Sequence, residues 1–131
     1  MTDSDILLRA AYRGGPVTVT HATAEEIEAL AGPVSLGDSK LGDDMLELWS
    51  LIAIRFEAAV EIHALGWRVL LANTWVSSRV VAANLTEGIV RTRSGKMYLL
   101  GVRDKPDLDP ELRAHLAYAL KTWGFIDVQQ S

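Results

Sequence analysis

SSRVVAANLTEGIVRTRSGKMYLLG, residues 77–101, is the stretch that decides the predicted fold. It contains three short β-prone runs, separated by two turns that contain Gly88 and Gly95. Glycine readily takes the positive φ that tight hairpin turns require, so the pattern predicts an antiparallel β-meander. The predicted strands are 79–85, 89–93 and 96–102.

The second turn fixes the predicted register of the meander. A two-residue turn at Ser94–Gly95 pairs Thr92 with Met97 and Arg91 with Tyr98. Because side chains alternate along a strand, one face is then core and the other is solvated, basic and aromatic. This basic face is the candidate partner-binding site, for a protein or for nucleic acid, although it is also typical of a solvated sheet face. Its residues are Arg79, Arg91, Arg93, Lys96, Tyr98 and Arg103.

The preceding residues predict a long helix from Asp43 or Asp44 to about Leu65, ended by Gly66. Polar residues recur there at steps of three and four, as on the wet stripe of an otherwise buried helix. The predicted fold is therefore a single α+β domain over 1–131. In it, an antiparallel meander of three or four strands packs against this long central helix and a C-terminal helix.

Local signals assign the remaining elements. Thr23 and Glu26 form a capping box that opens a short helix. Asp109 as N-cap followed by Pro110 predicts the start of the C-terminal helix, which ends near Trp123. The other predicted elements are a helix at 4–12, a strand at 17–20, a loop at 33–43, a strand or short helix at 67–76 with strand favoured, and a last strand at 125–128.

Composition narrows the class of protein. The 131 residues are 49% hydrophobic and 23% charged, as in an ordinary globular domain. The absence of cysteine excludes disulfides and thiolate chemistry, and the N-terminus lacks a secretory pattern, so a cytoplasmic protein without a membrane span is expected. The net charge of −4 divides unevenly, because only residues 67–105 carry an excess of basic over acidic side chains.

Catalytic and metal-binding patterns are missing from the sequence. There is no phosphate-binding glycine loop and no His-Glu-x-x-His or Gly-x-Ser-x-Gly pattern, so no cofactor, metal or catalytic residue is predicted. Glu57, Glu61 and His63 are close in sequence, but on a helix His63 lies roughly 200° around the axis from Glu61. A solvated stripe is therefore favoured there. The four tryptophans fit a core or an interface, including that of a homodimer.

The hairpin carries one resemblance to known proteins. Ser78-Arg79-Val80 followed by Thr92-x-Ser94-Gly95-x-x-Tyr98-x-Leu100-Gly101 resembles a hairpin of small accessory proteins from proteobacterial phages and plasmids. Anti-CRISPR proteins are among these. The resemblance covers about a fifth of the chain, implies binding to a host protein, and carries over no catalytic residue.

The favoured function is a small non-enzymatic intracellular binding protein of a phage or mobile element. It would block or bridge a host macromolecular complex, most concretely as an anti-CRISPR-type inhibitor. One alternative is a nucleic-acid-binding regulator that uses the basic sheet face. Another is a small enzyme that uses Glu57 or Glu61 with a histidine in a pocket between the sheet and the long helix.

Overall fold

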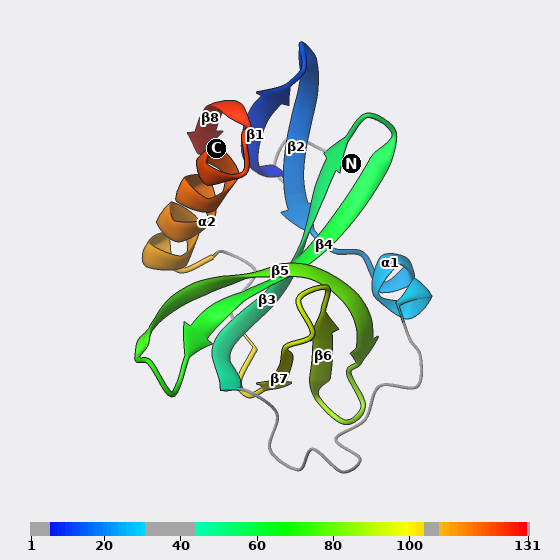
Figure 1. Cartoon of the computed structure of the whole chain (residues 1–131), viewed down its shortest axis with the longest axis vertical. Coiled ribbons are helices and arrows are strands. Elements are labelled where there is room, and N and C mark those ends of the chain that lie inside the picture. Colours follow the sequence, from blue (N-terminus) through cyan, green and yellow to red (C-terminus); the bar gives the residue numbers. More distant parts are fainter. Residues whose placement is uncertain (1–5, 31–43, 104–107, 131) are drawn as a thin grey trace.

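The computed structural model describes residues 6–30, 44–103 and 108–130, which form eight strands and two helices (Figure 1). The predicted α+β fold with a long central helix is wrong, because the chain is mainly β and is built on a closed five-stranded barrel. The elements are β1 (Ile6–Tyr12), β2 (Gly15–His21), α1 (Ala24–Ala29), β3 (Asp44–Phe56), β4 (Ala59–Arg68), β5 (Asn73–Asn84), β6 (Ile89–Thr92), β7 (Met97–Leu100), α2 (Pro110–Thr122) and β8 (Ile126–Gln130).

The barrel consists of β3 to β7. Neighbouring strands pair antiparallel in chain order, and β7 closes the ring by pairing in parallel with the first residues of β3. The second half of β3 pairs instead with β2, from which β1 and β8 continue the sheet beyond the barrel. Strand β3 thus belongs both to the barrel and to the sheet extension (Figure 1).

The predicted long helix is the β3–β4 hairpin. Ile52 and Ile54 face the core beneath α2, whereas Leu51 and Ala53 face the barrel interior. A strand that is buried on both faces shows a continuous apolar run instead of an alternation, and a helix covered on most sides shows the same. The spacing of the apolar residues therefore does not distinguish a buried strand from a buried helix in this segment.

The turn between β3 and β4 gave no sequence signal. Phe56 pairs with Ala59, which leaves Glu57 and Ala58 as a two-residue loop with φ of 50° and 60°. Both central residues of a type I′ turn need positive φ, and Asn-Gly is the usual sequence. Here Glu57 and Ala58, both ordinary helix-forming residues, occupy these positions, so the sequence predicts a helix through the turn.

Gly66 does not end a helix. It lies in β4 opposite a β-bulge, where Leu48 has a φ of 50° and the register shifts between Glu47 and Ser50. A Cβ atom at Gly66 would lie 2.9 Å from the Glu47 carbonyl oxygen and 3.2 Å from the Trp49 Cα. Only glycine allows the bulged backbone to approach this closely.

The two helices cover different parts of the sheet. Helix α2 packs its fully buried Leu112, Leu116 and Leu120 on the outer face of β4 and β5. Helix α1 directs Ile27 toward the barrel interior and is tied to β3 by an ion pair between Glu26 and Arg55, with Nη2 2.8 Å from Oε1. The predicted capping box and the Asp109 N-cap are both confirmed.

Five further predictions have mixed outcomes. The predicted helix at 4–12 is wrong, because residues 6–12 are strand β1, whose pairing with β2 and β8 overrides its helical spacing. The stretch at 67–76 is not one element: it ends β4, turns over 69–72 and begins β5. The strands predicted at 17–20 and 125–128 are present, and the loop predicted at 33–43 lies outside the described residues.

We expect Gly66→Ala to lower the free energy of unfolding by about 1–3 kcal/mol, because the added methyl group forces the bulge away from β4. Gly15→Ala is the matched control, since its Cβ would meet only the Tyr12 carbonyl oxygen at 3.6 Å. Urea denaturation of both variants measures the difference. Equal stability of the two variants would contradict the close approach at Gly66.

We expect Ala58→Gly to stabilise the protein by about 1 kcal/mol, because glycine removes the cost of a left-handed residue. The same substitution one residue later, Ala59→Gly, lies within β4 and should destabilise it by about 0.5–1 kcal/mol. Thermal unfolding of the pair tests the turn type. A loss of stability in both variants would count against a type I′ turn.

Candidate functional site

A pocket with a volume of about 300 Å³ combines titratable, basic and aromatic side chains. It is lined from β4, β5, β6–β7, the end of α2 and the sheet extension, so the chain contributes to it from segments far apart in sequence. We call it the His63 pocket. Its lining residues are Tyr12, Phe56, Glu61, His63, Ser78, Arg79, Arg93, Trp123 and Phe125.

His63 is the buried centre of this pocket. The residue is only 4% exposed, and its ring stacks on Trp123 with centroids 4.6 Å apart. Its Nδ1 lies 2.8 Å from the Ser77 carbonyl oxygen, which can only accept, so Nδ1 carries the hydrogen. This tautomer leaves the lone pair of a neutral ring on Nε2, which lies 3.3 Å from Glu61 Oε1.

The charge state of His63 follows from its burial. Desolvation lowers the pKa of His63 below its usual value, and nearby Arg79 lowers it further, although Ser77 and Glu61 act in the opposite direction. The ring is therefore neutral at pH 7. Its contact with Glu61 becomes a hydrogen bond only when Nε2 gains a proton, because a lone pair and a carboxylate both accept.

An aromatic cluster forms the apolar wall of the pocket. Tyr12, Phe56 and Phe125 come from β1, β3 and the segment between α2 and β8. Each ring lies 5.2–5.3 Å from the other two, centroid to centroid, in tilted or edge-to-face arrangements. Such contacts hold the rings in fixed orientations, so this wall is preformed.

Two arginines supply the positive charge of the pocket. Arg79 pairs directly with His63 across β4 and β5, and the Arg93 backbone N–H donates to the Arg79 carbonyl oxygen at 2.7 Å. Ser78 on β5 also contacts Ser94 in the β6–β7 turn, with the hydroxyl oxygens 3.2 Å apart. Within the described part of the chain neither guanidinium forms an ion pair, and Glu61 is the only carboxylate that lines the pocket.

Of the six residues predicted for the basic face, Tyr98 is buried and Arg103 lines a different hollow from Arg79 and Arg93. Arg79 and Arg93 reach the His63 pocket, Arg103 lies at another hollow where it stacks on Trp49, and Arg91 and Lys96 are exposed outside both. Tyr98 is only 4% exposed, because it points into the barrel and accepts a hydrogen bond from Trp75 Nε1 at 3.1 Å.

The register of the hairpin explains the position of Tyr98. Val90 pairs with Tyr98 and Arg91 with Met97, one residue away from the predicted register. The β6–β7 turn is longer than two residues, because the Thr92 N–H donates to the Lys96 carbonyl oxygen. A shift of one residue exchanges the two faces of a strand, which moved Tyr98 from the predicted surface to the core.

The helix predicted for this segment places Glu61 and His63 on different faces, so the sequence does not predict them as a pair. On a strand, residues two apart lie on the same face, so the argument that separated them by about 200° does not apply. Glu57 lies in the β3–β4 turn and does not line the pocket. The spacing of two residues between a carboxylate and a histidine was the available signal, and it depended on the correct assignment of secondary structure.

Comparison with known protein families, with curated proteins and with solved structures finds no match. Among residues 6–30, 44–103 and 108–130, no group of three or more potential metal ligands comes together. No helix in these ranges is long and apolar enough to cross a membrane.

We expect the free energy of unfolding to fall as the pH is lowered from about 7.5 through 6.5 and below. His63 and His115 both have pKa values lowered by burial, so the unfolded chain takes up protons that the folded protein excludes. The Glu26 pKa is lowered chiefly by its hydrogen bond with Arg55, so loss of that contribution begins only as the pH falls through about 4.5.

Urea midpoints at pH 7.5, 6.5 and 5.5 measure this dependence. His63→Asn retains an N–H donor for the Ser77 carbonyl oxygen but cannot titrate. The urea midpoint of this variant should therefore depend less on pH. His115→Asn is the control for the second histidine, which hydrogen-bonds Thr74 at 2.6 Å and is less enclosed. An unchanged slope in His63→Asn would show that the ring is not neutral and buried.

Proposed function

We propose that this protein is a binding protein that recognises an acidic segment of a protein partner through the His63 pocket. It acts by masking or bridging that partner and does no chemistry on it. The most concrete form is an inhibitor of a host system carried by a mobile element, a form that rests on the hairpin resemblance alone.

The observation that carries this proposal is the convergence of Arg79 and Arg93 at one aromatic pocket without a described carboxylate partner for either. Arginine recognises carboxylates through two parallel hydrogen bonds, and it is enriched among the residues that dominate binding energy. The aromatic wall offers apolar contact beside this charge. An Asp or Glu flanked by an apolar residue matches both features.

A protein partner fits the distribution of charge better than nucleic acid does. The chain carries a net charge of −4, and Arg103 lines a different hollow from Arg79 and Arg93. A phosphate backbone requires a continuous basic track, usually with exposed rings that stack on the bases. Tyr98, the ring expected to stack, is inside the barrel.

An enzyme is the second candidate function, because the pocket does hold a carboxylate and a histidine 3.3 Å apart. A neutral Nε2 oriented through Nδ1 by a carbonyl oxygen has the arrangement of a general base. The two candidates differ in what happens to the partner. A binding protein leaves the covalent mass of a purified partner unchanged, whereas an enzyme alters it and His63→Asn prevents the alteration.

The test compares two double variants of equal charge change. Arg79→Glu/Arg93→Glu alters the pocket, and Arg91→Glu/Lys96→Glu alters exposed basic residues of the same hairpin outside it. Nuclease-treated affinity capture identifies a partner, and isothermal titration with that purified partner gives the dissociation constant. We expect the pocket variant to weaken binding at least about thirtyfold and the control variant to change it less than about threefold.

Equal weakening of binding by both variants would mean that the partner is attracted by the positive charge of the hairpin in general and not by the pocket. Loss of the captured partner after nuclease treatment would favour nucleic acid. Either result would overturn the proposal. Circular dichroism spectra of both variants establish that they remain folded.

A further inference from the structure

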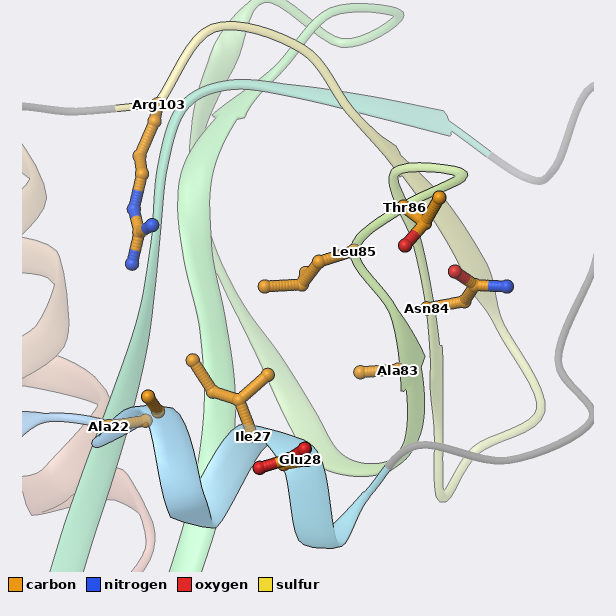
Figure 2. Close-up of a pocket in the computed structure, with 9 residues that line it drawn as sticks. Ala22, Ile27, Glu28, Ala83, Asn84, Leu85, Thr86 and Arg103 are labelled. Atoms are coloured by element: carbon orange, nitrogen blue, oxygen red, sulfur yellow. The ribbon is translucent and has the colours of Figure 1, made fainter.

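A second, larger hollow lies between α1 and the end of β5 and has a volume of about 560 Å³ (Figure 2). It shares no lining residue with the His63 pocket. Its size falls within the range of small-molecule sites, which often occur at the mouths of barrels. We call it the α1 cleft.

The interior of the α1 cleft is apolar. Ala83 forms part of the barrel core, and Ile27 of α1 packs against the same core. Figure 2 shows Leu85 extending from the β5–β6 turn into the space above Ile27. Leu85 is 38% exposed, which leaves a large apolar side chain in contact with water unless another apolar group covers it.

Arg103 places one positive charge at the rim of the cleft. Its guanidinium carbon lies 4.9 Å from the centre of the Trp49 ring, and Trp49 is itself fixed by an Nε1–H bond to the Gly101 carbonyl oxygen at 2.9 Å. No ion pair joins Arg103 to any other residue that the structure describes. A cation that is held by stacking and donates no hydrogen bond to another described residue is a preorganised site for an anion.

The other charged side chain of the cleft is Glu28 on α1. Figure 2 shows it below Ile27, while Arg103 approaches from the far side of Leu85. The cleft therefore has a positive side, a negative side and apolar side chains between them, and the polar Asn84 and Thr86 complete its lining. A ligand with one anionic end and an apolar body fits the cleft in one orientation, with its anion at Arg103 and away from Glu28.

We infer that the α1 cleft binds an amphipathic monocarboxylate, with the carboxylate on Arg103 and the apolar chain on Ile27, Ala83 and Leu85. The interaction is non-covalent and uses none of the residues of the His63 pocket. It is independent of the proposed protein partner, and Arg79→Glu/Arg93→Glu should bind the carboxylate as the unchanged protein does.

Decanoate is the probe, and decanol is the matched ligand without charge. We expect decanoate to bind with a dissociation constant below about 1 mM, and to shift the amide signals of Ile27, Ala83 and Leu85 and the indole N–H signal of Trp49 in ¹H–¹⁵N spectra. Decanol should bind about tenfold more weakly, because it lacks the charge-assisted contact.

Arg103→Gln should weaken decanoate binding about tenfold and leave decanol binding unchanged. Arg91→Gln is the control for charge, since Arg91 is exposed and lines neither hollow. Leu85→Ser should weaken both probes. The inference is overturned if decanoate gives no saturable shifts, if the shifts lie outside the cleft, or if Arg103→Gln and Arg91→Gln have equal effects.

Discussion

The structure depends on the double burial of β3. Its side chains alternate between the barrel interior, where Leu51 and Ala53 lie, and the core beneath α2, where Ile52 and Ile54 lie. A strand with two buried faces needs a covering layer on each side. The barrel strands provide one layer, and α2 provides the other. Full burial of one large apolar side chain contributes about 1.5–3 kcal/mol to stability. The side chains on the two faces of β3 therefore hold the barrel strands on one side and α2 on the other.

The bulge opposite Gly66 allows β3 to serve both layers. Before the bulge β3 pairs with β7 and closes the barrel, and after it β3 pairs with β2 and starts the sheet extension. A bulge bends the strand and increases its twist, which turns the two halves toward different partners. Trp49 lies in the bulged region, and its ring supports Arg103 at the α1 cleft.

The division of the sheet into a barrel and an extension leaves two hollows at the surface of the barrel. The His63 pocket lies where the outer face of the barrel meets the end of α2 and the sheet extension, so aromatic residues of the extension face arginines of the barrel. The α1 cleft lies where α1 covers the barrel interior only in part. The titratable histidine is in the first hollow and the stacked arginine in the second. Each hollow therefore offers a different chemistry to a ligand, although both border the same barrel.

Local signals in the sequence determined the capping box at Thr23, the start of α2 at Asp109 and the strands of the 77–101 stretch, because these depend on hydrogen bonds and φ preferences of a few neighbouring residues. Tertiary structure alone decided that residues 44–65 form a hairpin, since double burial erases the alternation that marks a strand and the Glu57–Ala58 turn lacks glycine. It also decided the one-residue register that buries Tyr98 and the pairing that brings His63 and Arg79 together. Hairpin register follows from the length of the turn, which Ser94–Gly95 alone does not fix, and the pairing of β4 with β5 depends on the hairpin that the tertiary structure forms.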